Sequence, residues 1–235
     1  MSIRYILFDL DGTLLPMDQN AFVKAYFGLL AKKLAPHGYE APSLIDGIWK
    51  GTAAMVQNDG RCTNEAAFWN CFASLLGEHT KADEPLFDEY YHNEFQQVQS
   101  VCGFTPKAAE VVQALKDRGY TLALATNPIF PAIATESRMR WAGLNREDFV
   151  LYTTYENSSR CKPNPAFYPD VLAQLGADAT QCLMVGNDVE EDMVAATLGM
   201  KVFLLTDCLI NKHDKDISQF PHGSFDALME YIQTL

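Results

Sequence analysis

The sequence predicts an α/β fold in which a doubly wound parallel sheet is interrupted, after its first strand, by an all-helical insert. Two observations lead to this fold class. Short apolar segments alternate with helical segments over the second half of the chain, an order that builds parallel strands joined by right-handed crossovers. Between about residues 18 and 100, apolar and aromatic residues instead recur at helical spacing with no convincing strand.

The predicted elements follow from these patterns in chain order. The strands are expected at 3–8, 121–125, 149–153, 182–185 and 201–205. The helices of the core are expected at 106–117, 130–142, 165–175 and 189–198, and those of the insert at 19–35, 43–57, 63–76 and 83–100. Residues 1–16 and 104–235 are therefore predicted to form the core, and residues 17–103 a separate helical cap domain.

Composition narrows the class of protein. Thirty acidic residues outnumber 18 lysines and arginines, giving a formal charge of −12, and such a surface repels nucleic acid and anionic lipid. No apolar run is long enough to cross a bilayer, and the N-terminus lacks the basic region and cleavage site of a signal peptide. We expect a cytoplasmic protein that acts on small molecules, with six cysteines present as reduced thiols.

A pair of acidic residues follows the first predicted strand. Asp9 and Asp11 are two positions apart, so both carboxylates can face one side of the extended chain, and Gly12 allows a sharp turn there. Two carboxylates this close favour a hard divalent cation, and they can divide the work of nucleophile and proton shuttle. The alternative is a plain acidic turn, but the whole string DLDGT after an N-terminal apolar strand favours the functional interpretation.

Two further groups of polar residues lie where helices are expected to begin. Thr126 and Asn127 follow the strand at 121–125, and a hydroxyl with backbone amides at such a turn suits a phosphate oxygen. Lys162 precedes a helix among prolines, where its ammonium can neutralise a phosphate or an attacking carboxylate. Each is weak alone, since Thr126 and Asn127 can simply start a helix and a single lysine is ordinarily solvated.

A fourth group, the string GNDVEED at 186–192, follows the strand at 182–185. Asp188 lies at the predicted turn and Asp192 one helical turn later, so both can face one site. Acidic residues also suit a helix N-terminus for dipole reasons. Four acids in five positions exceed what capping needs, and a cation shared with Asp9 and Asp11 explains the excess better.

These four signatures, in this order, resemble those of the haloacid dehalogenase superfamily of phosphohydrolases, over residues 3–15 and about 105–207. The resemblance implies a Rossmann-like core with a helical cap inserted after the first strand. It also implies that Asp9 attacks phosphorus and becomes an aspartyl phosphate. Asp11 would protonate the leaving alkoxide and then activate water.

The resemblance implies roles for the other motifs as well. Thr126 and the Asn127 backbone would hold the phosphoryl group, and Lys162 would balance the charge around Asp9. Mg²⁺ would be bound by Asp9, by the carbonyl of Asp11 and by the acidic residues of the fourth motif.

The fourth motif departs from the common pattern, because Asn187 lies between Gly186 and the first acid. The principal metal ligand is therefore open among Asp188, Glu191 and Asp192. We favour Asp188, with Asp192 supporting it.

The turn between two insert helices, residues 58–64, is the candidate for substrate contact. Asn58, Arg61 and Asn64 supply hydrogen-bonding groups, and Arg61 is the only arginine of the cap. A plain turn that caps the next helix is the equally weighted alternative. The aromatic residues of the insert are predicted to be mostly helix core.

The predicted function is Mg²⁺-dependent hydrolysis of a small-molecule phosphate monoester. Dehalogenases of the superfamily lack a proton-shuttling acid at the position of Asp11, so this residue favours phosphoryl transfer. A sugar phosphomutase shares all four signatures and would need a cap residue that binds a second phosphate. The alternative of a different class is a non-enzymatic phosphoacceptor or binding protein, but receiver domains are shorter, lack the insert and carry the acceptor on a middle strand.

Overall fold

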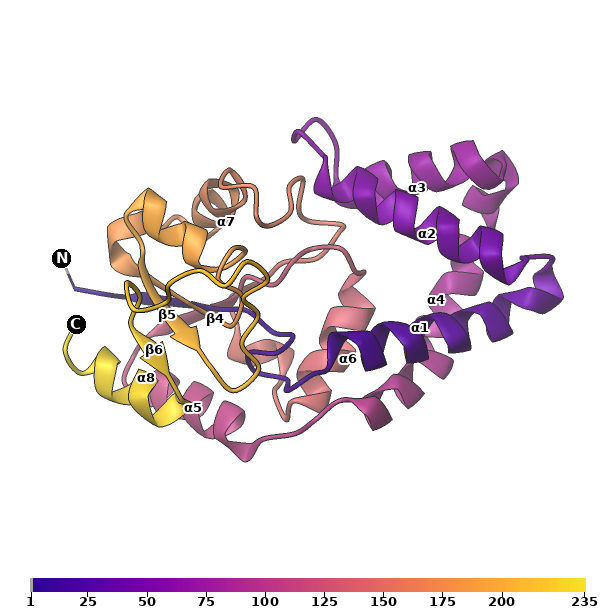
Figure 1. The fold of residues 1–235 in the computed structure, drawn as a ribbon. Helices are drawn as coiled ribbons and strands as arrows, with labels where there is room; N and C mark the ends of the chain where they lie inside the picture. The colour runs from indigo at the N-terminus through magenta and orange to yellow at the C-terminus, as the bar shows by residue number, and fades with distance from the viewer. Residues whose placement is uncertain (1) are drawn as a thin grey trace.

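A six-stranded parallel sheet, with strand order β3-β2-β1-β4-β5-β6, forms the centre of one lobe of the protein (Figure 1). The computed structural model describes residues 2–235. The strands are β1 (Tyr5–Phe8), β2 (Thr121–Leu124), β3 (Leu151–Tyr152), β4 (Cys182–Gly186), β5 (Lys201–Leu205) and β6 (His222–Gly223). β1 pairs with both β2 and β4, so that Leu7 lies opposite Ala123 and Met184. The doubly wound α/β fold predicted from the sequence is confirmed.

Helices on both faces explain why the central strands are apolar throughout. Ile6 and Phe8 join a cluster with α5 (Pro106–Asp117), α8 (Phe225–Ile232) and the helical insert. Leu7 points to the other face and packs in a second cluster with α7 (Phe167–Leu175). A strand buried on both faces reads as a continuous apolar run, which is the pattern of residues 5–8. The short β6 and the helix α8 were not predicted.

The helical insert forms the second lobe (Figure 1). Its helices are α1 (Gln19–Leu34), α2 (Ala41–Val56), α3 (Asn64–Leu76) and α4 (Glu84–His92), with 3₁₀ turns at Ala35–His37, Glu78–Asp83 and Glu94–Val101. The two connections to the core run side by side, since Met17 bridges Cys102 and the N–H of Gly103 donates to the Pro16 carbonyl at 2.7 Å. Both connections pass from one lobe to the other at the residues where the boundaries of the cap were expected. We propose that they are the joints between core and cap.

Two predicted helices are wrong in detail, for the same physical reason. The helix expected at 83–100 breaks at Asn93, whose side-chain Nδ2 donates to the Glu89 carbonyl at 2.9 Å and whose backbone leaves the helical region. The helix expected at 189–198 is a turn followed by the 3₁₀ segment Met193–Leu198. There the Asp188 carboxylate accepts the N–H groups of Glu190 and Glu191. Side chains that bond nearby backbone compete with the helical hydrogen bonds.

The remaining core helix, α6 (Ala132–Trp141), lies between the sheet and the insert. It packs against α4 and against the 3₁₀ segment Glu94–Val101 of the insert. Within residues 2–235, no helix combines the length and the apolarity needed to span a bilayer.

Candidate active site

The carboxyl ends of β1, β2 and β4 open into a cavity of about 290 Å³ between the core and the insert. In an open α/β sheet this edge is where ligands bind, because the loops that leave neighbouring strands meet there. Core residues of the cavity include Asp9, Asp11, Thr126, Asn127, Lys162, Asn187, Asp188, Glu191 and Asp192. The four sequence motifs are therefore brought to one place.

Lys162 links the first and fourth motifs. Its Nζ donates to Asp9 Oδ1 at 2.9 Å and to Asp192 Oδ1 at 2.6 Å, and the residue is only 1% exposed. Burial alone would lower the pKa of Lys162, but the carboxylates of Asp192 and Asp9 outweigh it and hold that pKa well above its usual value. The lysine is therefore a fixed cation beside Asp9 and not a solvated side chain.

The turn after Asp9 is held by Thr13 and Asn187. The Thr13 hydroxyl lies 3.0 Å from Asp9 Oδ2 and 2.9 Å from Asn187 Oδ1, so the two acceptors share one donor. Asn187 Nδ2 donates to the Cys208 carbonyl at 2.6 Å, which fixes the orientation of its amide. Gly12 has φ of 84°, and a Cβ there would collide with the Asn187 amide. The residue that departs from the family pattern thus joins the first motif to the fourth.

The two aspartates of the fourth motif differ in how their carboxylate oxygens are used. Asp192 uses both oxygens inside the protein, because Oδ1 accepts from Lys162 and Oδ2 accepts the Asp188 N–H at 2.9 Å. Gly186 makes room for this arrangement, since a Cβ there would collide with the Asp192 carboxylate. Asp188 uses Oδ1 for backbone N–H groups, while none of the hydrogen bonds formed by residues 2–235 involves Oδ2. Asp188 keeps an oxygen available for a ligand, whereas Asp192 positions its neighbours.

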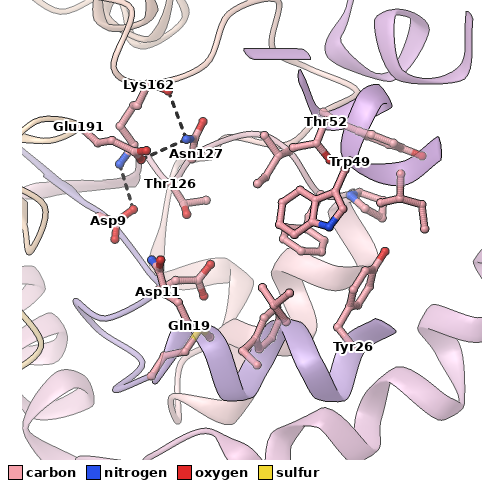
Figure 2. A pocket seen from close by; sticks show the side chains of 18 of the residues that line it. Asp9, Asp11, Gln19, Tyr26, Trp49, Thr52, Thr126, Asn127, Lys162 and Glu191 are labelled. Atoms are coloured by element: carbon pink, nitrogen blue, oxygen red, sulfur yellow. Dashed lines mark hydrogen bonds and ion pairs between the residues drawn. The ribbon is translucent and has the colours of Figure 1, made fainter. Parts of the chain in front are cut away.

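The second motif presents one free hydroxyl to the cavity. Thr153 Oγ1 donates to the Thr126 carbonyl at 2.6 Å and so holds the loop, whereas the Thr126 hydroxyl forms no hydrogen bond within the described part of the chain. Asn127 Nδ2 donates to Glu191 Oε2 at 3.0 Å, and its own Oδ1 is buried without a partner among those residues. Figure 2 shows Thr126 and Asn127 facing the cavity beside Lys162 and Glu191.

Arg138 was missed by sequence reasoning. It extends from α6, is 1% exposed and forms an ion pair through Nη1 with Asp11 Oδ2. Its guanidinium lies over the Phe130 ring, 4.4 Å from the centroid. Asp11 Oδ1 is buried and has no hydrogen-bond partner in residues 2–235. Burial raises the pKa of Asp11, and Arg138 opposes that shift.

A signal for Arg138 was present in the sequence. Its helical neighbours four residues away, Ala134 and Ala142, are small, apolar and fully buried. A charged residue in such a row requires a charged partner, because burying an unpaired ion is costly.

The charge balance of the cavity suits a bound cation. Five core carboxylates line it, whereas Lys162 and Arg138 are the buried cations next to them. Burial raises the pKa of Glu191 to about 7. Repulsion from Asp192 and Asp188 adds to this rise, and the Lys162 ammonium opposes it. Burial likewise raises the pKa of Asp192 to about 6, against the effect of Lys162. Carboxylates crowded in this way favour an added positive charge.

The oxygen ligands of the cavity suit Mg²⁺ better than they suit a metal ion whose ligands all come from protein side chains. No group of three acidic, histidine or cysteine side chains in the described chain is arranged to enclose a metal. Mg²⁺ usually keeps several waters and binds one or two carboxylates together with substrate phosphate oxygens. The carboxylates of Asp9 and Asp188, with the backbone carbonyl of Asp11, satisfy that smaller requirement.

The insert contributes an aromatic wall to the cavity. Its lining residues are Met17, Gln19, Phe22, Val23, Tyr26, Phe27, Ile48, Trp49, Thr52, Phe68, Trp69, Phe87, Asp88 and Tyr91. The aromatic residues were predicted to be mostly helix core. Many of them are buried, but they also face the cavity, because the inner side of the insert is at once its core and the roof of the site.

The predicted contact residues of the insert lie elsewhere. Asn58, Arg61 and Asn64 are not among the residues that line the cavity. Asn58 Nδ2 donates to Asn64 Oδ1 at 2.9 Å, and Asn64 Nδ2 donates to the Pro128 carbonyl of the core at 3.1 Å. The Arg61 side chain is 87% exposed and pairs with Asp59. The two asparagines satisfy each other in a buried contact between insert and core.

Comparisons with known proteins agree with this geometry. A family model described as haloacid dehalogenase-like hydrolase matches residues 3–198. The ribulose-1,5-bisphosphate 5-phosphatase of Halopiger xanaduensis is 27% identical over 207 residues, which cover 85% of this chain and 83% of that protein. The phosphoglycolate phosphatase of Vibrio parahaemolyticus is 27% identical over 238 residues, covering 99% of this chain and 96% of the relative.

Solved structures share the fold over the whole chain. The crystal structure of a 2-haloacid dehalogenase from Pseudomonas syringae pv. tomato is similar with a TM-score of 0.64 and 21% identity, covering 99% of each chain. Likeness at this level of identity concerns the fold, so the chemistry has to be argued from the site.

Proposed function

The chain belongs to the haloacid dehalogenase-like hydrolase family, and we propose that it is a magnesium-dependent phosphatase that hydrolyses a small-molecule phosphate monoester through an aspartyl phosphate on Asp9. The family resemblance inferred from the four motifs is confirmed, and so is the prediction of a hydrolase. The observation that carries the proposal is the pair Asp9 and Asp11 at one cavity wall, with Lys162 Nζ 2.9 Å from Asp9 Oδ1.

Asp9 is suited to act as the nucleophile. Lys162 and Thr13 each contact one of its oxygens, which orients the carboxylate and partly neutralises it. An anionic phosphate can then approach an anionic nucleophile at lower electrostatic cost. A new bond forms between an Asp9 oxygen and phosphorus while the bond from phosphorus to the alcohol oxygen breaks.

Asp11 is suited to move the proton. Arg138 holds Oδ2, which leaves Oδ1 as the oxygen that can reach a leaving group in the cavity. Because burial raises the pKa of Asp11, the carboxyl can carry a proton on Oδ1 before it donates it to the departing alkoxide. In the second half, the same oxygen accepts a proton from the water that attacks phosphorus, and inorganic phosphate leaves Asp9 free.

The remaining residues hold the phosphoryl group and the ion. The free hydroxyl of Thr126, with the neighbouring Asn127, suits the phosphoryl oxygens. Asp9, Asp188 and the carbonyl of Asp11 would hold Mg²⁺, and when bound the ion supplies charge neutralisation between nucleophile and phosphate. Asp192 keeps Lys162 and the Asp188 turn in place through its two hydrogen-bonded oxygens.

The insert argues against a sugar phosphomutase. Such an enzyme needs a site for a second phosphate, and none of the insert residues that line the cavity, within the described chain, is a lysine, arginine or histidine. The two relatives named above are phosphatases, which supports hydrolysis.

The proposal is tested by steady-state hydrolysis of p-nitrophenyl phosphate. We expect turnover with Mg²⁺, loss of turnover in EDTA, and loss of turnover in Asp9→Asn while that variant remains folded at the assay temperature. Acid quenching of a reaction with Asp11→Asn, followed by intact-mass measurement, should reveal a phosphoryl adduct on Asp9. Full activity of Asp9→Asn would contradict the proposal.

A further inference from the structure

We infer that the substrate carries its phosphate on an uncharged group with a single flat apolar ring, and not on a second anion or a carboxylate. This inference rests on the proposed function and adds to it the class of alcohol that leaves. It is drawn from the charges, the aromatic surface and the volume of the cavity.

The insert half of the cavity offers no charge for an anion. Among residues 2–235, the insert side chains that line it include no basic residue, and Asp88 is the one acid. A carboxylate or a second phosphate placed there would lose its water without gaining a charged partner, which is costly. The inference therefore excludes the kind of second charge that phosphoglycolate carries.

The buried cations of the core are already paired with carboxylates. Lys162 is committed to Asp9 and Asp192, and Arg138 to Asp11. Lys212 is exposed and lines the cavity two residues after Ile210, which bridges Asp188. Lys212 thus belongs to the loop beside the fourth motif, where the phosphate is expected.

The aromatic wall has one large ring that is not covered. Trp49 is 51% exposed although it lines the cavity, and the centroid of its ring lies 5.4 Å from that of the Phe27 ring. Figure 2 shows Trp49 with Thr52 and Tyr26 across the cavity from Asp9 and Lys162. A ligand ring placed against Trp49 would bury apolar surface that water now contacts, and aromatic pairs add attraction beyond burial.

The two tyrosine hydroxyls of this wall make few demands on a ligand. The hydroxyls of Tyr26 and Tyr91 bond each other at 2.9 Å, and Tyr26 is stacked on Tyr91 with centroids 6.4 Å apart. Because this hydroxyl pair is satisfied internally, this part of the wall behaves as an apolar surface toward the substrate.

The volume of the cavity suits a small ligand. At about 290 Å³ it lies just below the range of roughly 300–1,000 Å³ for small-molecule sites. The phosphoryl group must share this space, and one ring with a short linker fits in what remains.

Benzyl phosphate and phosphoglycolate form a matched test, because both join the phosphate to a CH₂ group that bears either a phenyl ring or a carboxylate. We expect kcat/KM with Mg²⁺ to be at least about tenfold higher for benzyl phosphate. Equal or better hydrolysis of phosphoglycolate would overturn the substrate class and leave the proposed function standing. Absence of Asp9-dependent hydrolysis of both esters, and of p-nitrophenyl phosphate, would overturn both proposals.

Two variants test whether the Trp49 ring is the cause of the expected preference for benzyl phosphate. Trp49→Ala should lower the ratio of kcat/KM for benzyl phosphate to that for phosphoglycolate by about threefold or more, mainly through KM. Phe104→Ala is the matched control, because Phe104 is 63% exposed and lies outside the cavity, and the ratio should not change. An equal loss on both esters in Trp49→Ala would overturn the role of the ring.

A third variant adds to the insert wall the positive charge that it lacks. Thr52 lines the insert half and is only partly buried, so a lysine there can point into the cavity. Thr52→Lys should raise the efficiency with phosphoglycolate relative to benzyl phosphate by about tenfold. A folded variant, judged by its melting temperature, that leaves this ratio unchanged would overturn the claim that missing charge excludes anionic leaving groups.

Discussion

The core wall and the insert wall of the cavity are built from different interactions. On the core wall, Lys162, Asp192 and Asn187 are buried, each makes at least two hydrogen bonds, and each bonds at least one residue of another motif or of the turn after Asp9. On the insert wall the contacts are mostly between aromatic rings, and Trp49 remains half exposed. A network of buried charges tolerates little change, whereas an apolar wall can be altered by one side chain at a time. The reaction is therefore expected to depend on the core, and the choice of substrate on the insert.

The largest effect should come from Lys162→Met. Removing this cation leaves Asp9 and Asp192 buried beside each other without a counter-charge, which should cost about 3–5 kcal/mol of unfolding free energy. Urea unfolding measures the loss. Lys201→Met is the control, because Lys201 is exposed at the start of β5 and its replacement should change stability by less than about 0.5 kcal/mol.

A second change distinguishes charge from packing at the same site. In Lys162→Met, the further replacement Asp192→Asn should recover part of the lost stability, because it removes one of the two unpaired charges. If the double variant is as unstable as the sum of the single ones, the core wall is held by shape and not by charge.

The next effect concerns Arg138→Met. Without the guanidinium, Asp11 loses the partner that holds its Oδ2, so proton transfer from Oδ1 should become less efficient. We expect kcat to fall by about 10–100-fold for an alkyl phosphate and clearly less for p-nitrophenyl phosphate, whose leaving group needs less protonation. Arg140→Met, an exposed neighbour on α6, is the control. Equal losses on the two esters would indicate a purely structural role for Arg138.

A smaller effect is expected in how the stabilisation of the fold by Mg²⁺ depends on pH. Glu191 and Asp192 have raised pKa values, about 7 and about 6, so the folded protein holds protons that the unfolded chain has released. Without Mg²⁺, these two groups make stability fall as pH rises from about 4 to about 7. Mg²⁺ competes with those protons, so its increase in melting temperature should be larger at about pH 8 than at about pH 5.5.

The control for this linkage is Asp188→Asn, which should reduce the Mg²⁺-induced shift at both pH values. A Mg²⁺-induced shift that is larger at acid pH would show that the crowded carboxylates are not where the ion binds.

The smallest effect should be on the insert wall itself. Tyr26→Phe removes one hydroxyl of the pair with Tyr91 and should cost about 0.5–1.5 kcal/mol of unfolding free energy, well below Lys162→Met. Tyr120→Phe is the control, because in the described chain the Tyr120 hydroxyl forms no hydrogen bond. A loss as large as that of Lys162→Met would remove the contrast between the two walls.

Much of the core could be predicted because its signals are local. The strand of residues 5–8 is apolar on both faces, and Asp9 and Asp11 follow it directly, so both the element and its acidic end are visible in adjacent positions. The structure of the insert was harder to predict from the sequence. The break at Asn93 depends on one side chain bonding the preceding turn, and the path of residues 58–64 depends on a contact between Asn64 and Pro128.

The sequence by itself determined the fold class, the family and the position of Asp9, because strand periodicity and a short acidic motif are properties of neighbouring residues. Tertiary structure alone decided that Arg138 meets Asp11, that both oxygens of Asp192 are occupied, and that Trp49 rather than Arg61 borders the cavity. Arg138 and Asp11 are 127 positions apart, and no local pattern records which buried charge will find which partner. That pairing is settled only when the chain closes and each buried ion must be neutralised.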